Sequence, residues 1–326
     1  PPRSTLFPYT TLFRSVERKY IISIDMGGTK ILGSIINSKE GIVKRYKRST
    51  KVQKGNPKKK NDFAATLYEI VQELLNSSKI SENQILAICL GIPGSVNPIT
   101  GKIGIAPNLN IKNYNIKEIL QKFTKIPVLI ENDVNLATLG IQHFGYGIDK
   151  KNMLVVFVGT GIGGGLVFNS HLYRGTTFFA GEIGHIEIEK EGPQCGCGKI
   201  GCFEAFASRT AIVRDIVADI KSGKKSVLSK LVKENTPIKS KALLNAMTRG
   251  DKLVARHINA ASEKIGLVLA NLNNLLNFEI IVLGGGVIEA LHSFILPKVR
   301  ESFKNHSLVS SAKGVRVVAT KLGDDA

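Results

Sequence analysis

The chain has 326 residues, 43% of them hydrophobic, and a formal net charge of +19. This length predicts two domains with a core each, and the lack of any long apolar run excludes a membrane-spanning protein. The lysines are scattered except at residues 51–60, whose Gly, Asn and Pro predict a solvated loop, and no aromatic residues interleave with them. We therefore expect neither a nucleic-acid nor a membrane partner, although the positive charge favours an anionic nucleotide.

Residues 1–15 are predicted to be foreign to the protein. The string TLFPYTTLFRS at residues 5–15 looks like the translation of a sequencing-adapter oligonucleotide, so residues 1–15 are left out of the fold prediction. Pro8 and several polar residues interrupt any apolar core, which argues against a signal peptide. The native chain is expected either to begin near Val16 or to have lost sequence upstream of it.

Strand and helix patterns alternate through the first half of the remaining chain. A β-branched run at 20–24 ends in a glycine turn, and the segment 62–75 carries apolar residues at helical spacing after a capping Asn61 or Asp62. The sequence predicts strands at 20–24, 31–36, 42–46, 85–90 and 127–130, and helices at 62–75, 116–123 and 134–143.

The second half opens with the same pattern as the first. A predicted strand at 153–158 leads through a glycine turn at 159–164 to another strand at 165–168. Later segments predict helices at 208–220, 253–276 and about 291–303, and strands at 279–283 and about 315–320. This repeat predicts two similar α/β lobes, with one glycine turn from each facing a shared cleft.

The two glycine turns carry the residues expected at a phosphate site. The first, DMGGTK at residues 25–30, offers backbone N–H groups, a threonine hydroxyl, a lysine charge, and Asp25 to hold Mg²⁺ through water. The second, GTGIGGG at residues 159–165, is neither a Walker A loop nor a Rossmann turn, because no Gly-Lys-Ser/Thr closes it and a strand follows it. Taken alone, such a turn is better explained as a plain β-hairpin, but the pair predicts a nucleotide cleft.

Two further segments lie at predicted strand ends. The glycines at residues 284–286 suit a flat surface against an adenine or ribose, or else a simple turn after the strand. Glu131, Asn132 and Asp133 stand where a strand meets a helix, the position at which ligands gather in α/β sheets. Taken alone, helix capping by Asn132 or Asp133 is the favoured explanation.

Residues 181–204 predict a structural zinc site. They hold three of the four cysteines and a histidine, a complete tetrahedral set that leaves no position for water: His185, Cys195, Cys197 and Cys202. A disulfide is the alternative, but the low cysteine content and the Cys-x-Cys spacing favour a metal in a reducing, cytoplasmic compartment. Glu182 and Glu204 are then not needed as zinc ligands and are free to bind another group. Cys89 is predicted to be a core residue, and His143, His171 and His257 to be surface or packing residues.

The pattern as a whole resembles the ROK family of sugar kinases and repressors over residues 19–326. Its most specific part is Gly-Glu-x-Gly-His followed by Cys-x-Cys-Gly-x-x-Gly-Cys-x-Glu, which residues 181–185 and 195–204 fill at every position. Residues 25–30, 159–165 and 284–286 match the nucleotide-binding segments of the family. The resemblance implies a two-lobed, actin-like and hexokinase-like (ribonuclease H-like) α/β ATPase fold, with lobes at 16–130 and 131–326 and the zinc loop in the second.

The resemblance also implies a role for each residue of these segments. Asp133 is expected to be the general base that takes the proton from the primary hydroxyl of the sugar. His185 is expected to bind zinc through one ring nitrogen and a sugar hydroxyl through the other. The expected substrate-binding residues are Gly94, Asn108, Asn132, Gly161, Glu182, His185 and Glu204. The expected ATP-binding residues are Asp25, Gly27, Gly28, Thr29, Lys30, Thr160, Gly284 and Gly285.

The implied activity is ATP-dependent phosphorylation of a hexose at its 6-hydroxyl, with glucose foremost and with Mg²⁺ and structural Zn²⁺ as cofactors. Residues 107–109 resemble the glucokinase branch, although kinases for fructose, mannose, N-acetylglucosamine and N-acetylmannosamine share the sugar-holding residues. A sugar-sensing repressor of the same family is the alternative, but no DNA-binding module is visible ahead of Tyr20 and the nucleotide turns are retained. The family further implies a homodimer and a glycine-rich terminal helix, so this chain is expected to be truncated at both ends.

Overall fold

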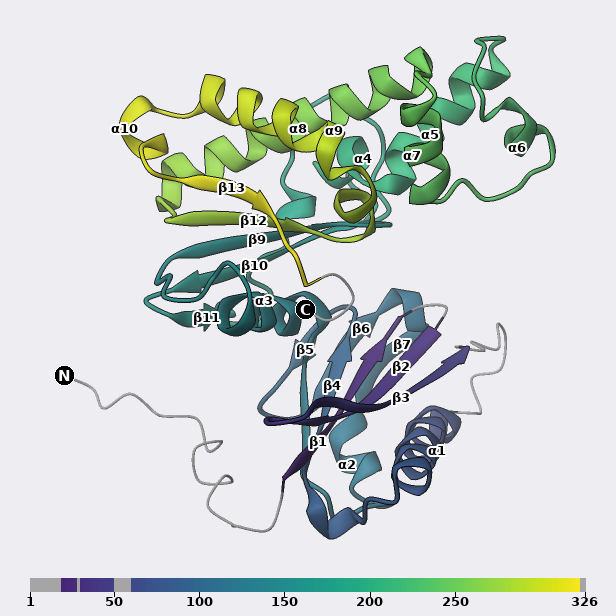
Figure 1. The fold of residues 1–326 in the computed structure, drawn as a ribbon, viewed down its shortest axis with the longest axis vertical. Helices are drawn as coiled ribbons and strands as arrows, with labels where there is room; N and C mark the ends of the chain where they lie inside the picture. Colours follow the sequence, from purple (N-terminus) through teal and green to yellow (C-terminus); the bar gives the residue numbers. More distant parts are fainter. Residues whose placement is uncertain (1–18, 28–29, 50–59, 323–326) are drawn as a thin grey trace. The chain divides into compact units, whose positions relative to one another are not determined.

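The computed structural model describes residues 19–27, 30–49 and 60–322. The chain divides into two compact units, Pro1–Leu136 and Ala137–Ala326, and the division falls within helix α3 (Asp133–Phe144). Each unit contains a five-stranded mixed sheet with helices packed against it (Figure 1). Among the described residues, no helix has both the length and the apolar character that crossing a membrane requires.

The large sheet of the first unit has the strand order β3-β2-β1-β4-β8. β1, β2 and β3 form an antiparallel meander, and β4 and β8 run parallel to β1. The strands are β1 (Tyr20–Met26), β2 (Lys30–Asn37), β3 (Gly41–Ser49), β4 (Ile85–Ile92) and β8 (Val128–Asn132). Helix α1 (Lys60–Ser78) packs on this sheet so closely that a Cβ at Gly33 would come within 2.9 Å of Ile70 and Leu74. The glycine therefore sets the distance between the helix and the sheet.

A second, three-stranded antiparallel sheet in the first unit was not predicted from the sequence. It consists of β5 (Val96–Asn97), β6 (Lys102–Ala106) and β7 (Ile111–Asn115), and its buried Ile103 and Tyr114 join the core of the unit. The short elements around it are η4 (Glu82–Gln84), η5 (Pro107–Leu109) and α2 (Ile116–Leu120). This sheet brings the chain after β4 back toward the end of β8, where candidate site residues lie.

The sheet of the second unit has the order β11-β10-β9-β12-β13, which matches the order in the first unit strand for strand. Its strands are β9 (Met153–Val158), β10 (Ile162–Phe168), β11 (His171–Tyr173), β12 (Ile280–Gly284) and β13 (Arg316–Ala319). Alternate residues of β9 face opposite sides: Leu154 belongs to the larger core, and Met153 belongs to a smaller one that includes Ile141 of α3. Both faces of this sheet are therefore covered.

Helices α8 and α9 cover one face of this sheet, and α3 covers the other (Figure 1). The larger core lies between the sheet and the α8–α9 pair, and the hydrophobic strand residues at its centre, on β9 and β12, are fully buried. The helical elements of the unit are η6 (Ile183–His185), α4 (Glu204–Ala207), α5 (Arg209–Lys221), α6 (Ser229–Lys233), α7 (Ser240–Thr248), α8 (Lys252–Leu276), α9 (Gly286–His306) and α10 (Val309–Ala312).

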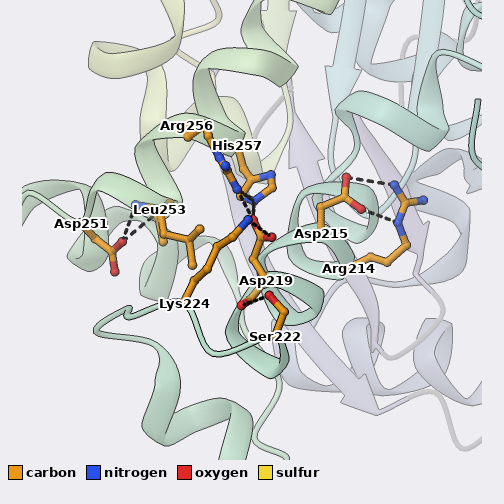
Figure 2. Close-up of polar contacts among 10 residues, drawn as sticks. Arg214, Asp215, Asp219, Ser222, Lys224, Asp251, Leu253, Arg256 and His257 are labelled. Carbon is orange, nitrogen blue, oxygen red and sulfur yellow. Dashed lines mark hydrogen bonds and ion pairs between the residues drawn. The ribbon is translucent and has the colours of Figure 1, made fainter.

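A charged cluster centred on Asp219 joins the end of α5 to the beginning of α8 (Figure 2). The Asp219 carboxylate contacts Lys224 Nζ at 2.5 Å, His257 Nε2 at 2.7 Å and the guanidinium of Arg256. The hydrogen bonds from Lys224 and then His257 lower the pKa of Asp219 to about 2. His257, predicted to be a surface or packing residue, is thus a packing residue that ties two helices together.

Two sequence predictions about the glycine segments were wrong. Residues 159–164 were predicted to form the turn, but β10 begins at Ile162 and contains Gly163, Gly164 and Gly165. The glycine at 165 reflects packing rather than a turn, because a Cβ there would lie 1.9 Å from the Thr138 hydroxyl oxygen. The helix predicted from about residue 291 begins at Gly286, so residues 284–286 connect the end of β12 directly to α9.

Candidate active site

The parallel strands of the first unit align three residues at one edge of its sheet. Asp25 at the end of β1 pairs with Gly91 of β4, and Gly91 pairs with Glu131 of β8. These are the carboxyl ends of parallel strands, where α/β proteins bind their ligands. The predicted metal-binding Asp25 and the segment 131–133 are therefore brought to the same edge, separated by one strand.

Asp133 is the first residue of α3 and is half-buried. Its Oδ1 accepts a hydrogen bond from the N–H of Val134 at 2.9 Å, which orients the carboxylate at the start of the helix. A Cβ at Gly91 would lie 3.8 Å from Asp133 Cα and 3.2 Å from Leu136. The glycine on β4 consequently lets the first turn of α3 approach the sheet, so that Asp25 and Asp133 both flank Gly91.

Asn132 fills the capping role that its position in the sequence suggested. Its Oδ1 accepts the N–H of Asn135 at 3.1 Å, and its Nδ2 donates to the carbonyl oxygen of Gly94 at 3.1 Å. Glu131 is buried, and its Oε1 accepts hydrogen bonds from the Asn132 N–H and from Asn135 Nδ2. Sequence analysis missed the supporting roles of Glu131 and Asn135, which only the folded connection between β8 and α3 reveals.

Gly94 must be a glycine for two independent reasons. Its φ angle is +118°, and a Cβ would lie 2.3 Å from the carbonyl oxygen of Ile105 on β6. Its own carbonyl is the acceptor for Asn132, so the β8–α3 connection is tied to the small sheet. Asn108 lies in η5, which follows β6 directly, and its side chain falls outside the described residues.

The first glycine turn is described only at its two ends. The N–H of Gly27 donates to the carbonyl oxygen of Lys30 at 2.8 Å, which closes a tight turn between β1 and β2. Gly28 and Thr29 lie outside the described residues. The turn therefore connects Asp25, at the end of β1, with Lys30, which opens β2.

The second glycine turn lies in the equivalent place between β9 and β10 of the second unit. The N–H of Gly159 donates to the carbonyl oxygen of Gly161 at 2.9 Å, and Thr160 is exposed at the tip. Arg209 Nη2 donates to the Thr160 hydroxyl at 2.7 Å, and the Thr210 hydroxyl donates to the Thr160 carbonyl oxygen at 2.7 Å. Neither Arg209 nor Thr210 was predicted, because no local spacing relates them to a turn nearly fifty residues earlier.

The four predicted zinc ligands converge on one point of the second unit. One ligand atom from each of His185, Cys195, Cys197 and Cys202 lies within 4.8 Å of all the others. Cys195 Sγ is 3.7 Å from His185 Nδ1, and Cys197 Sγ is 3.7 Å from Cys202 Sγ. Ligands held at about 2.0–2.3 Å in a tetrahedron around zinc are roughly 3.3–3.8 Å apart, so these residues fit the ion. In the described residues all four cysteines, Cys89 included, are free thiols.

The environments of the cluster thiols differ. Burial raises the pKa of Cys195 to about 12, whereas a backbone hydrogen bond from Lys199 lowers that of the exposed Cys197. A cation in the cluster favours the thiolate at every position, since thiolate is the form that binds metal. Without a metal, the buried sulfur atoms therefore keep their protons, and metal binding would release these protons.

The histidine of the cluster presents its second nitrogen away from the cysteines. Its Nδ1 faces Cys195, and its Nε2 lies 3.9 Å from Glu182 Oε2. Both side chains remain partly exposed, at 35% for His185 and 49% for Glu182, so polar groups of a ligand can reach them.

Glu204 opens α4 and lies between the cysteine cluster and the second glycine turn. Its Oε2 accepts the N–H of Ile162 at 2.7 Å, and its Oε1 is 3.7 Å from Cys195 Sγ. A Cβ at Gly161 would lie 2.4 Å from Oε2, which explains the glycine at that position. Among the predicted residues of the second unit, Gly161, Glu204, Cys195, His185 and Glu182 thus form one continuous group.

Gly284 and Gly285 make the sharp connection from β12 to α9. Gly285 has a φ angle of +86°, and a Cβ there would lie 2.7 Å from the carbonyl oxygen of Val158. A Cβ at Gly284 would lie 2.7 Å from the ring of Phe157. Both glycines therefore allow the start of α9 to approach the end of β9, one residue before the second glycine turn begins.

The sequence pattern of the ROK family matches residues 21–326. The chain belongs to the ROK family. Its relatives in this family include the glucokinase of Halalkalibacterium halodurans, which is 33% identical over 309 residues covering 94% of this chain and 92% of the relative. They also include the xylose repressor of Caldicellulosiruptor bescii, which is 29% identical and is covered over 75% of its length.

Solved structures of ROK proteins share the fold. The ROK family glucokinase from Streptomyces griseus in complex with glucose and AMPPNP superposes with a TM-score of 0.79 at 26% identity, covering 93% of this chain and 95% of that one. A ROK family transcriptional regulator, a homologue of the E. coli MLC protein, superposes with a TM-score of 0.81 at 24% identity, over 92% and 74% of the two chains. The predicted actin-like, hexokinase-like α/β fold is confirmed, and the ROK family contains both kinases and repressors.

Proposed function

We propose that this ROK protein is a kinase that transfers the γ-phosphoryl group of ATP to the 6-hydroxyl of a hexose, with glucose as the substrate. The observation that carries the proposal is the alignment of Asp25, Gly91 and Glu131, which brings a metal-binding carboxylate and the Asp133 carboxylate to one edge of a sheet. Phosphoryl transfer requires a positioned base, a divalent cation and groups that neutralise phosphate charge rather than a covalent intermediate.

Asp133 is the general base of this reaction. A carboxylate at the start of a helix, oriented by the N–H of Val134, accepts the proton of the sugar hydroxyl as that oxygen attacks phosphorus. Asp25 would hold Mg²⁺ through water, an arrangement that suits an ion reluctant to lose its hydration shell. Gly27, Lys30 and Thr160 contact the phosphates of ATP, together with Gly28 and Thr29. Gly284 and Gly285 line the adenosine part of the nucleotide.

The hydroxyl groups of the sugar are held by carboxylates and by one imidazole. Glu182 and His185 Nε2 are partly exposed and close together, and carboxylates accept hydrogen bonds from adjacent hydroxyls. Glu204 contributes Oε1, since its Oε2 is engaged by Ile162. Asn132, Gly94, Asn108 and Gly161 complete the set of sugar-binding residues.

Zinc is the structural ion of the cysteine cluster. His185, Cys195, Cys197 and Cys202 would hold it, and the ion would fix the tautomer and the orientation of the imidazole. With four protein ligands, the ion would have no open coordination position and would serve a structural purpose. Its contribution is therefore to the shape of the segment that carries Glu182 and Glu204.

A sugar-binding repressor is the second candidate, because the xylose repressor of Caldicellulosiruptor bescii matches 94% of this chain. The discriminating experiment is a panel of glucose, fructose, mannose, N-acetylglucosamine and N-acetylmannosamine with MgATP, in which ADP release and sugar phosphate are both measured. We expect stoichiometric ADP and glucose 6-phosphate. Sugar binding without phosphoryl transfer would favour the repressor, and transfer to a different hexose would correct the substrate. Sedimentation of the same sample tests the expected homodimer.

A further inference from the structure

Arg209 connects the start of α5 to the glycine turn at residues 159–161. Its backbone N–H donates to the carbonyl oxygen of Gly159 at 2.8 Å, and its Nη2 donates to the Thr160 hydroxyl at 2.7 Å. Thr210 adds a third hydrogen bond, to the Thr160 carbonyl oxygen. Consecutive residues of α5 therefore hold both the backbone and the side chain at the tip of this turn.

The guanidinium group of Arg209 keeps most of its hydrogen-bonding capacity. Its bond to Thr160 is the only side-chain hydrogen bond that it makes within the described residues, and no carboxylate there forms an ion pair with it. Arg214 and Arg256, by contrast, are paired with Asp215 and Asp219 (Figure 2). Arginine has several N–H donors in a planar fork, so Arg209 retains donors and an uncompensated charge at the turn.

The bond from Arg209 also determines what the Thr160 hydroxyl can do. A hydroxyl group has one proton to donate and two lone pairs that accept. Because Nη2 donates to Thr160 Oγ1, one of those lone pairs is occupied and the hydroxyl proton is directed elsewhere. Thr160 is exposed, so its hydroxyl becomes a donor facing outward from the turn.

We propose that Arg209 is a phosphate-binding residue, which presents its guanidinium to the terminal phosphates of ATP and fixes Thr160 as a second donor. The proposal rests on the kinase function proposed above, in which Thr160 contacts those phosphates. Arginine matches phosphate oxygens with paired N–H groups, and charge-assisted hydrogen bonds of this kind are stronger than neutral ones. The second glycine turn has no other cation of its own, so Arg209 supplies the positive charge that Lys30 supplies to the first turn.

A purely structural role for Arg209 makes a different prediction. The side chain of a residue that only fastens the turn acts through the Thr160 hydroxyl, so its loss should weaken ATP binding no more than the loss of that hydroxyl does. A residue that itself binds the terminal phosphates adds a loss of its own, which grows with the number of phosphates on the nucleotide. The test therefore compares the dissociation constants of ATP, ADP and AMP for the full chain by calorimetry, without sugar, so that catalysis does not enter the measurement.

The variants are Arg209→Gln and Arg209→Lys, with Arg214→Gln as the matched control. Arg214 lies one turn further along α5 and bonds to Asp215 and to the Ala205 carbonyl oxygen, so its loss removes comparable helix contacts away from the turn. We expect R209Q to weaken ATP binding by about 10-fold or more while AMP binding changes less than about 2-fold. R209K, which keeps the charge without the fork, should lie in between.

A Thr160→Val variant completes the comparison. Because Arg209 acts partly through the Thr160 hydroxyl, the losses of ATP affinity in R209Q and T160V should be less than additive in the double variant. Two results would overturn the assignment and leave the kinase function intact. In the first, R209Q weakens the binding of ATP, ADP and AMP equally. In the second, R209Q binds ATP as tightly as the control variant R214Q does. Failure of the unaltered chain to bind ATP at all would instead overturn the kinase function, and this proposal with it.

Discussion

Glu204 Oε2 accepts the backbone N–H of Ile162 at 2.7 Å, at the point where the second glycine turn enters β10. The other carboxylate oxygen lies 3.7 Å from Cys195, a member of the candidate zinc site. One carboxylate therefore links the cysteine cluster to the strand that carries the turn. If the proposed function holds, this side chain connects the residues proposed to bind sugar with the turn proposed to bind phosphate.

Replacement of Gly161 by alanine should disturb this link. The new Cβ would lie 2.4 Å from Glu204 Oε2, so the carboxylate would have to move and the Ile162 N–H would lose its partner. An unsatisfied buried donor costs about 1–3 kcal/mol, and we expect a lower melting temperature and roughly 10-fold weaker glucose binding. Gly159→Ala is the control for stability, because its Cβ would meet only the Gly161 carbonyl oxygen, at 4.0 Å. A G161A variant with unaltered glucose affinity would show that Glu204 does not contribute to the sugar site.

Replacement of Asp133 by asparagine should separate binding from chemistry. Asparagine preserves an oxygen that can accept the Val134 N–H but cannot accept the proton of the sugar hydroxyl. We expect the turnover number to fall by roughly 10²–10⁴-fold, while the dissociation constant of glucose, measured by calorimetry, changes little. Turnover close to that of the unaltered protein would remove Asp133 from the role of base.

Replacement of Cys197 by serine should release the metal. We expect about one zinc per chain in the unaltered protein by elemental analysis, and in C197S a loss of zinc, of thermal stability and of glucose affinity. Cys89→Ala is the matched control, because that thiol lies on β4 of the first unit and belongs to no cluster of potential metal ligands in the part of the chain that the structure describes. Zinc loss with full glucose affinity would disprove the claim that the ion orients His185.

The Asp219 cluster should give a measurable dependence of stability on pH. Hydrogen bonds from Lys224 and His257 lower the pKa of Asp219 from 3.8 to about 2, so its stabilising effect is complete above the ordinary pKa and is lost as the pH falls toward 2. The difference in melting temperature between the unaltered chain and Asp219→Asn should therefore be constant near neutrality and shrink below pH 4.

Asp215→Asn serves as the comparison for this measurement, since among the described residues Asp215 bonds to Arg214 alone whereas Asp219 bonds to three groups (Figure 2). We expect a smaller loss of melting temperature for D215N at neutral pH. If D219N and the unaltered chain had the same melting temperature at neutral pH, the cluster would contribute no net stability, as is common for exposed ion pairs.

The elements that the sequence predicted correctly are those whose signal is local. The β-branched runs of β1 and β9 and the helical spacing of α8 depend on neighbouring residues, and each lies within a few residues of its predicted position. The cysteine cluster could also be predicted, because the types of its ligands and their spacing are read from a short stretch of sequence. The small sheet β5-β6-β7 was missed because its strands are short and gain their stability from packing on the rest of the unit.

Glycine was the residue most often misinterpreted. Gly163 and Gly164 were predicted to belong to the turn, yet both stand within β10. Ile183 of η6 approaches Gly164, and Thr138 of α3 approaches Gly165, too closely for a Cβ. Sequence cannot distinguish a glycine required by φ from one required by a neighbour that is distant along the chain. The same limit concealed Arg209, whose significance appears only when α5 is folded against the second glycine turn.

The shared strand order of the two sheets has unequal consequences for how they form. In the first unit Tyr20 must find Ile85, whereas in the second Met153 must find Ile280, after the cysteine cluster, α5 and α8 have all been synthesised. Loop closure becomes more costly with length, and parallel pairing cannot begin until the later strand exists. On the ribosome, β9 therefore waits with an unpaired edge until β12 emerges, and that interval is the time at which the nascent second unit is most exposed to aggregation.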